Sequence, residues 1–202
     1  MYTGLIQGVG RVSSIESTDS GARILLDKGQ WTHTPTRGDS ISLNGCCLTV
    51  AVDPGPGGEL AFDAIPETLR MTTLGDLSEG SAINLEHSAR ADTFMGGHIV
   101  QGHIDGVGEV IRVTDSEEYR VRIRPPSDLM KFITPKGSVA VDGISLTVAA
   151  VDVEGDWFEV ALIPTTLADT NLDEAKPGSR VNLETDILAR TVVHYIEHYA
   201  KG

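Results

Sequence analysis

Short segments in which apolar and small polar residues alternate account for most of this chain. The clearest two are "SISLNGCCLTVAV" at residues 40–52 and "SVAVDGISLTVAAV" at residues 138–151. A period of two is typical of strands with one buried face, and the central Asn-Gly and Asp-Gly pairs favour tight turns. We therefore expect a β-hairpin at each position.

Other segments extend this β-rich pattern and add short helices. Further strands are predicted at "ARILLD" (22–27), "ELAFDAI" (59–65), "YRVRIRP" (119–125) and "WFEVALI" (157–163). The residues that follow Pro66 and Pro164, "ETLRMTTLGDL" and "TTLADTNLDEA", indicate short helices or turns.

The chain repeats itself. Gly45 and Gly143 occupy the same place in "NGCCLTV" and "DGISLTV", and 143 − 45 = 98 positions. The same offset aligns "GLIQGVG" with "GHIDGVG", "IPETL" with "IPTTL", and "NLE" at 84–86 with "NLE" at 182–184. We predict two homologous domains, residues 1–97 and 98–186. Short strands joined by Gly-rich turns suggest that each is a small closed β-barrel, because closure removes exposed sheet edges.

A helix with no counterpart in the first copy is predicted at residues 187–202. One apolar stripe runs along it, formed by Leu188, Val192, Tyr195, Ile196 and Tyr199. Two interpretations of this stripe remain open: self-association of the chain, or packing onto its own barrel.

Charge and composition exclude some partners. The formal net charge of −13 argues against nucleic acid and anionic membranes as partners. The two cysteines, Cys46 and Cys47, are neighbours in a predicted strand, so their side chains point to opposite faces and no disulfide is expected. No apolar run reaches the roughly 20 residues that span a bilayer, and "MYTGLIQGVGRV" does not have the pattern of a signal peptide. We expect a cytoplasmic protein.

The positions at which the two copies differ indicate different chemistry in two similar pockets. At offset 98 the pairs are Cys47 with Ser145, Leu5 with His103, Gly38 with Lys136, and Glu67 with Thr165. The first copy keeps a thiol, whereas the second has gained an imidazole and an ammonium group.

Five segments together resemble one family. "MYTGLIQGVG", "NGCCLTV", "PETLRMTTLGDL", "GGHIVQGHIDG" and "KGSVAVDGISLTV" are similar, in order and spacing, to the riboflavin synthase family of lumazine-binding, duplicated-barrel proteins. The resemblance covers essentially the whole chain. It implies a mainly β fold of two tandem homologous Greek-key barrels with a C-terminal α-helix.

The resemblance also implies an activity and an assembly. Two molecules of 6,7-dimethyl-8-ribityllumazine would be converted to riboflavin and 5-amino-6-(D-ribitylamino)uracil, without a metal or an organic cofactor. The subunits would form a homotrimer held partly by the C-terminal helix. The reacting pair would lie between the N-terminal barrel of one subunit and the C-terminal barrel of its neighbour. A lumazine synthase as a further partner is left open.

Site residues follow from the same resemblance. The first site is expected to contain Gly4, Leu5, Ile6, Cys47, Leu48, Thr49, Asp63, Ala64, Ile65, Pro66, Glu67 and Thr68. The second is expected to contain Gly102, His103, Ile104, Lys136, Ser145, Leu146, Thr147, Ile163, Pro164, Thr165, Thr166, Leu167 and Ala168. Positions that the family associates with catalysis correspond to Ser40, Cys47, His103 and Asp186.

We interpret His103 as a proton-transfer group or as the residue that orients a water or hydroxyl. Ser40 would supply or position the nucleophile, while Cys47 would pack beside the ring. Structural roles stay open for His103 and for Cys47, which also suits a small buried hydrophobe. His98 is expected to make a structural hydrogen bond. Lys136 would anchor the polyol or a ring oxygen, or be a solvated turn residue.

The chain departs from the family pattern at Tyr2, Leu5 and Thr165, and the last puts any acidic contact at that position in doubt. Two other functions compete with the enzyme. One is a non-catalytic lumazine- or flavin-binding protein of the fluorescent antenna type, against which the intact "GHIDG" and "DGISLTV" argue. The other is a zinc peptidase, because "HYIEH" at 194–198 matches H-x-x-E-H; that motif lacks room for a further ligand downstream.

Overall fold

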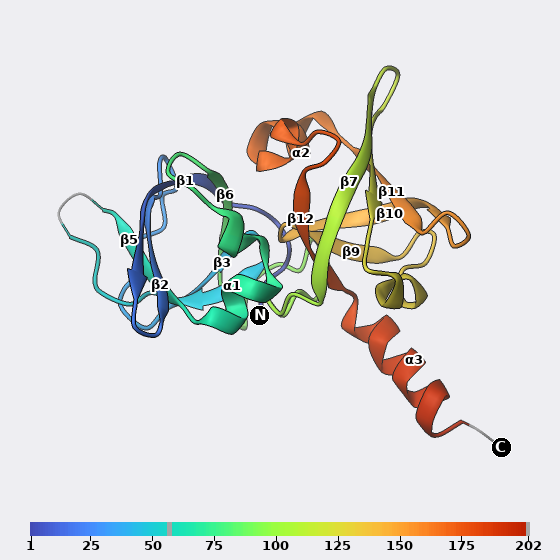
Figure 1. Ribbon diagram of the computed structural model, residues 1–202, viewed down its shortest axis with the longest axis horizontal. Coiled ribbons are helices and arrows are strands. Elements are labelled where there is room, and N and C mark those ends of the chain that lie inside the picture. The colour runs from blue at the N-terminus through green and yellow to red at the C-terminus, as the bar shows by residue number, and fades with distance from the viewer. Residues whose placement is uncertain (56–57, 201–202) are drawn as a thin grey trace.

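Two β-barrels lie side by side and a C-terminal helix extends away from them (Figure 1). This arrangement is seen in a computed structural model, which describes residues 1–55 and 58–200. The mainly β fold with two similar barrels and a C-terminal helix confirms the expected fold class.

The first barrel contains six antiparallel strands in the order β4-β3-β6-β1-β2-β5. The strands are β1 (Gly8–Thr18), β2 (Gly21–Asp27), β3 (Ser40–Leu43), β4 (Cys46–Thr49), β5 (Leu60–Ala64) and β6 (Ala82–His87). Between β5 and β6 lie helix α1 (Pro66–Met71) and the 3₁₀ helix η1 (Thr73–Asp76). The predicted hairpin at 40–52 is therefore confirmed, with its turn at Asn44 and Gly45.

The second barrel repeats this plan in the order β10-β11-β8-β7-β12-β9 and is closed. Its strands are β7 (Gly106–Asp115), β8 (Tyr119–Arg124), β9 (Ser138–Val141), β10 (Ile144–Asp152), β11 (Trp157–Leu162) and β12 (Arg180–Thr185). Its helices are η2 (Ser127–Phe132), α2 (Pro164–Asp169) and η3 (Asn171–Glu174), and helix α3 (Ile187–His198) follows.

Closure differs between the copies. In the first, a single isolated bridge between Val50 and Phe62 joins the two ends of the sheet, whereas β10 and β11 form a full ladder in the second. Strand β4 ends at Thr49, and the sequence then continues through Pro54, which has no N–H to donate to a ladder. The second copy has no proline in the corresponding stretch, and β10 runs on to Asp152.

Each barrel has its own apolar core. Leu43 and Leu85 lie in the first core, and their repeat partners Val141 and Leu183 lie in the second; all four are fully buried. The alternation along these strands thus places one face inward, as the pattern predicts.

The two barrels meet back to back at their hairpin turns. A Cβ atom added to Gly45 would lie 2.7 Å from the backbone nitrogen of Gly143, and one added to Gly143 would lie 2.7 Å from the nitrogen of Gly45. Both glycines have positive φ, +81° and +80°, as the turn requires. No side chain fits at either position, so the repeated Asn/Asp-Gly pairs set the distance between the barrels.

Buried amides join the two turns. Asn84 Nδ2 donates to the carbonyl of Asp142 at 3.0 Å, and Asn182 Nδ2 donates to the carbonyl of Asn44 at 2.8 Å. The two bonds are equivalent at offset 98, and the side chains of Asn84 and Asn182 are fully buried. Losing either amide would leave a buried carbonyl without its partner, which typically costs about 1–3 kcal/mol.

The contact between these two hairpin turns, called the joint below, is asymmetric in charge, which gives a first prediction. Full burial raises the pKa of Asp142 to about 7, whereas its repeat partner is the neutral Asn44. The folded state therefore binds a proton more tightly than the unfolded state, and stability falls as the pH rises from about 4 to 7. We expect Asp142→Asn to raise the free energy of unfolding by about 1–3 kcal/mol at pH 8, and by less at pH 5.

Chemical denaturation at the two pH values measures this difference. Asn44→Asp is the matched control, because it adds a second buried acid and should destabilise most at pH 8. An equal gain for Asp142→Asn at both pH values would contradict the assignment.

Candidate functional site

One short segment near the start of each copy crosses to the barrel of the other copy. The carbonyl of Gly4 accepts a hydrogen bond from the backbone N–H of Ser145 at 2.8 Å. In the equivalent contact, the carbonyl of Gly102 accepts from the N–H of Cys47 at 2.9 Å. Tyr2 and Val100 pair between the two segments as an antiparallel bridge. Each barrel is therefore flanked by a segment that belongs, in sequence, to the other copy.

The crossing changes the expected grouping of site residues. Ile6 packs against the core of the second barrel, and Ile104 packs against the core of the first. A pocket of about 210 Å³ beside the second barrel is lined by Gly4, Leu5, Ile6, Ile144, Ser145, Ile163, Thr165, Thr166, Asp169 and Thr170. Residues 4–6 thus lie with the second set, and residues 102–104 lie with Cys47 in the first. The grouping by sequence order is wrong because the segments pair across the joint.

Two buried glutamates hold these segments, and neither was singled out from the sequence. Glu86 accepts from the N–H and the hydroxyl of Thr3, both at 2.7 Å, and from the N–H of Gly4 at 3.0 Å. Its repeat partner Glu184 accepts from the N–H groups of three consecutive residues, 101–103, at 2.5–2.9 Å. Burial raises the pKa of both carboxyls, and these hydrogen bonds oppose the shift. The repeated "NLE" carried the signal, since the same acidic residue stands at the equivalent position of both copies.

The candidate first site lies on the outer face of the hairpin β3–β4. Ser40 pairs with Thr49 across the two strands, and Ser42 pairs with Cys47, so all four share that face. The Tyr2 hydroxyl donates to Cys47 Sγ at 3.0 Å, and burial together with the nearby thiol raises the pKa of Tyr2.

The neighbouring residues on this hairpin point inward instead. Cys46 lies in the core, and burial raises the pKa of its thiol to about 12. Leu48 is also a core residue. The two cysteines are both free thiols on opposite faces, as the alternation predicts.

The rim of the first site carries paired charges. Arg23 binds Asp63 through two hydrogen bonds of 2.8 and 2.9 Å, which lower the pKa of that carboxyl. Glu67 pairs with Arg70 one turn along α1, which likewise lowers its pKa. Among the other predicted members, Ala64 is buried in the core, Thr68 is half-buried, and Ile65 and Pro66 are exposed.

The candidate second site contains a histidine and a serine in direct contact. His98 Nδ1 lies 2.7 Å from Ser145 Oγ. Its Nε2 is buried and has no hydrogen-bond partner within the described residues. Burial lowers the pKa of His98, against the opposing charge of Asp186, and so favours the neutral form of the ring. His98 thus makes a hydrogen bond, as expected, and its partner is itself a predicted site residue.

The other predicted members of the second set vary in exposure. Leu146 belongs to the core, and Thr147 is exposed on the same strand. Lys136 is an exposed turn residue with φ +66°, and its backbone N–H donates to Val148. The remaining members follow β11 on the surface: Ile163, Pro164, Thr165 and Ala168 are exposed, and Thr166 and Leu167 are half-buried.

The four predicted catalytic positions lie on different elements of the chain. Ser40 and Cys47 share the hairpin β3–β4, and His103 follows Gly102, whose carbonyl contacts Cys47. The imidazole of His103 is exposed. Asp186 lies beyond β12 of the second barrel, where its carboxylate caps α3 by accepting from the N–H of Leu188 at 2.9 Å.

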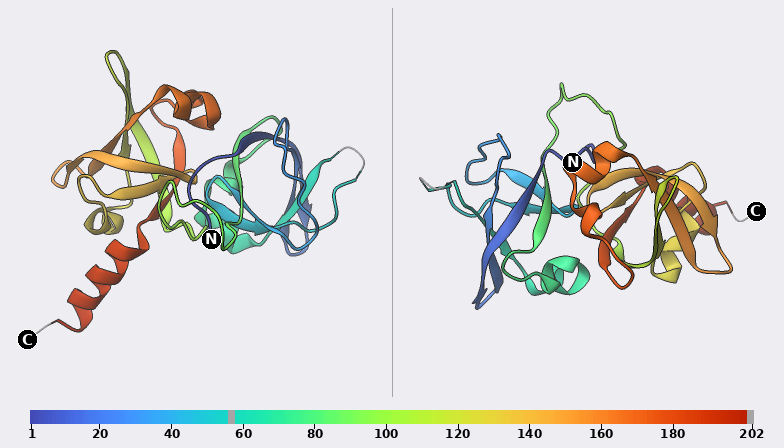
Figure 2. Two further views of the ribbon diagram at one scale, coloured as in Figure 1. Left: turned by 180° about the vertical axis from the view of Figure 1, so that it is seen from behind. Right: turned by 90° about the horizontal axis from the view of Figure 1, so that it is seen from above.

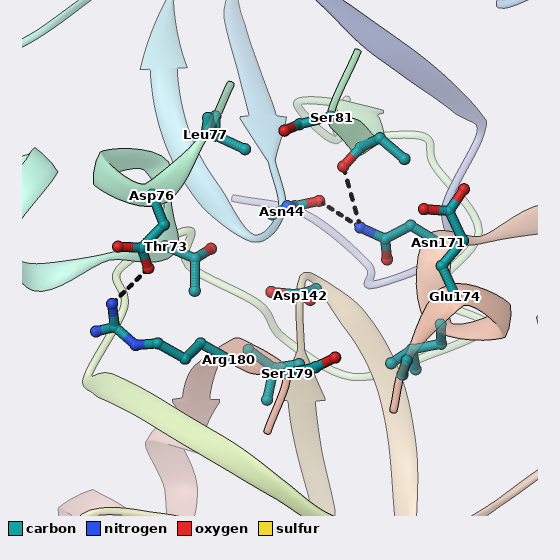
Figure 3. A pocket seen from close by; sticks show the side chains of 14 residues that line it. Asn44, Thr73, Asp76, Leu77, Ser81, Asp142, Asn171, Glu174, Ser179 and Arg180 are labelled. Atoms are coloured by element: carbon teal, nitrogen blue, oxygen red, sulfur yellow. Dashed lines mark hydrogen bonds and ion pairs between the residues drawn. The ribbon is translucent and has the colours of Figure 1, made fainter. Parts of the chain in front are cut away.

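A different pocket, of about 420 Å³, lies at the joint between the barrels (Figure 3). Asn44, Asp142 and Asn171 point into it, and Asn171 Nδ2 donates to Asn44 Oδ1 at 3.1 Å. Arg180 and Asp76 form an ion pair at its edge. None of the predicted site residues lines this pocket, and its polar groups largely bind one another across the joint.

The motif at 194–198 has a structural explanation. His194 and His198 stack on each other with ring centroids 4.4 Å apart, and Glu197 forms an ion pair with Lys131 at 2.9 Å. Within residues 1–55 and 58–200, no three His, Cys, Asp or Glu side chains are grouped to hold a metal ion. No helix in that same part of the chain is long and apolar enough to cross a membrane.

Comparison with known proteins agrees with this architecture. The family model of the lumazine binding domain matches twice, at residues 3–88 and 101–186, which are again 98 positions apart. Three solved structures of LumP have the same fold over 92% of this chain and 99% of theirs. They are its complexes with flavin mononucleotide (TM-score 0.80, 27% identity), 6,7-dimethyl-8-(1'-D-ribityl) lumazine (0.81, 27%) and riboflavin (0.82, 29%). The chain is a duplicated lumazine-binding-domain protein.

Curated relatives show which family within this class the chain belongs to. Riboflavin synthase of Mycobacterium tuberculosis is 45% identical over 194 residues, covering 95% of this chain and 96% of the relative. Riboflavin synthase of Escherichia coli is 39% identical over 201 residues, covering 98% and 92%. The chain belongs to the riboflavin synthase family.

The opposite orientations of the two thiols lead to a second prediction. Iodoacetamide should alkylate Cys47 at least about tenfold faster than Cys46, because a thiol reacts as its thiolate and needs access to solvent. Peptide mass spectrometry after timed quenching measures both rates. In a Cys47→Ala variant the fast phase should disappear; its survival would mean that Cys46 is the exposed thiol.

Proposed function

We propose that this chain catalyses the dismutation of two 6,7-dimethyl-8-ribityllumazine molecules. One lumazine gives a four-carbon unit to the other, which yields riboflavin and 5-amino-6-(D-ribitylamino)uracil. The observation that carries the proposal is a pair of homologous sites with different chemistry. One offers a thiol held by Tyr2, and the other offers a hydroxyl held by His98. A reaction that uses one substrate in two roles needs such a pair.

The reaction needs only a weak base, but it needs the two substrate molecules to be held in a fixed orientation. The C7 methyl of the lumazine is acidic, because its anion delocalises into the pteridine ring. Holding two rings face to face supplies about 7–11 kcal/mol of the barrier through orientation. A positioned proton-transfer group adds about 10²–10⁴-fold.

His98 and Ser145 suit proton transfer at the second site. A neutral imidazole at 2.7 Å from a hydroxyl can take up and return a proton through that hydroxyl. At the first site, Ser40 and Cys47 lie on the face that a bound ring would contact, and His103 stands at the edge of the crossing segment.

A binding protein without turnover is the second candidate. It is supported by the shared fold of LumP, whose structures hold lumazine, riboflavin and flavin mononucleotide. Sequence identity favours the enzyme, since it is 33–45% to the riboflavin synthases and 27–29% to LumP.

The assembly that we propose is a homotrimer in the cytoplasm, where two free thiols would stay reduced. The apolar stripe of α3 does not pack onto its own barrel: Leu188, Val192 and Ile196 are 65%, 57% and 55% exposed. Polar contacts tie the helix to its barrel instead, through Glu197 with Lys131 and Arg190 with Asp105. In Figure 2 the helix extends outward from the second barrel, which leaves the stripe available to a second copy.

Turnover tests the function directly. Purified protein incubated with 6,7-dimethyl-8-ribityllumazine should produce riboflavin, followed by its absorbance. We expect His98→Ala and His103→Ala each to lower kcat by about 10²-fold or more, because each removes a proton-transfer or orienting group.

His33→Gln is the matched control, since it changes a half-buried histidine outside both sites. Tight binding of the lumazine without any riboflavin would establish the binding protein instead. Unchanged turnover in both alanine variants would remove the two histidines from the mechanism.

The helix stripe gives a fourth prediction. Replacing Val192 and Ile196 together by Asp should convert the trimer to monomers, because charges cannot be buried in an apolar contact without a partner. Size-exclusion chromatography with light scattering measures the mass. Glu197→Gln on the same helix, which leaves the stripe intact, should stay trimeric. A monomeric parent protein would exclude the proposed assembly.

A further inference from the structure

We propose that Glu86 and Glu184 are positioning residues, and that each sets the geometry of the ligand site on the opposite barrel. Glu184 belongs to β12 of the second barrel and would govern the site at Cys47. Glu86 belongs to β6 of the first barrel and would govern the site at Ser145. The identity of these places as lumazine sites rests on the function proposed above, but the positioning itself does not.

The connection runs through one residue in each case. Gly102 donates its N–H to Glu184 at 2.8 Å, and its carbonyl accepts from the N–H of Cys47 at 2.9 Å. Gly4 donates its N–H to Glu86 at 3.0 Å, and its carbonyl accepts from the N–H of Ser145 at 2.8 Å. Each carboxylate is thus two hydrogen bonds away from the residue that distinguishes its site.

The group must be a carboxylate rather than any polar residue. Three donors point at each one, and an ionised carboxylate only accepts. A glutamine of the same shape would turn an NH₂ group toward one of these donors, so at least one bond would be replaced by a repulsive contact. The two side chains are 1% and 2% exposed, and solvent cannot replace the lost bond.

The burial of Glu86 and Glu184 indicates that these two residues have a role other than packing. A carboxylate removed from water is costly unless it is fully bonded, and an apolar side chain could fill a buried strand position without that cost. Both copies nevertheless place a glutamate here. These hydrogen bonds fix the backbone of residues 3–4 and 101–103, which belong to the segments that cross between the barrels.

The matched pair Glu184→Gln and Glu86→Gln tests the crossed assignment. The first readout is the rate of Cys47 alkylation by iodoacetamide. Glu184→Gln should raise it at least about fivefold by loosening the segment beside the thiol, while Glu86→Gln should leave it within about twofold.

The second readout is the NMR titration of the His98 imidazole, which contacts Ser145. Glu86→Gln should shift its midpoint or its chemical shifts, and Glu184→Gln should not. Both variants lose equivalent bonds, so a merely structural role would affect the two readouts alike.

Three results would overturn the proposal: equal effects of both variants on both readouts, effects on the same barrel instead of the opposite one, or no effect of either. If a Gln variant does not fold, as judged by circular dichroism, Glu184→Asp and Glu86→Asp replace it, because they keep the charge and shorten the reach. Neither readout needs turnover. Failure of the protein to bind lumazine would therefore refute the proposed function. The two readouts would still test the crossed positioning independently.

Discussion

The contact between two glycines is the constraint on which the rest of this structure depends. Gly45 and Gly143 touch backbone to backbone, and the buried amides of Asn84 and Asn182 fasten each turn to the other barrel. This contact places the two hairpins next to each other in a single orientation. Only then can the segments at residues 2–6 and 100–104 reach the opposite barrel and pair through Tyr2 and Val100.

The local elements and the duplication were accessible from the sequence. Alternation located the hairpins around Asn44 and Asp142, the offset of 98 defined two copies, and the apolar stripe located α3. Strands β1, β6, β7 and β12 were not predicted; in β1, Gly8, Gly10 and the serines interrupt the apolar pattern. Closure of the first barrel by a single bridge at Val50 was also missed.

The arrangement of the candidate site was less predictable than its members. Among the residues expected from the family resemblance, Leu48, Ala64 and Leu146 belong to the cores. Sequence order assigned residues 4–6 to the wrong barrel, because pairing between distant segments depends on how the barrels dock. The amide joint that decides this docking gives no periodic signal.

The chemical difference between the sites extends beyond the residues that differ at offset 98. Cys47 receives its hydrogen bond from Tyr2, but the repeat partner of Tyr2 is Val100, which has no polar group. Ser145 is bound instead by His98, from a position two residues earlier in the chain. The second site therefore has an imidazole, whose pKa burial lowers, in the role that a phenol hydroxyl has at the first.

The crossing of the two segments also constrains the length of chain between each segment and its own barrel, and the two matched domains begin 98 positions apart, at residues 3 and 101. An extra residue between a crossing segment and its own barrel would shift the wall of the other barrel's site out of register. Each copy can tolerate substitution of a side chain, but a change in the length of this connection in one copy would alter the sites of both barrels. Gene duplication in this chain has left two halves that differ in chemistry and remain tied to a common length.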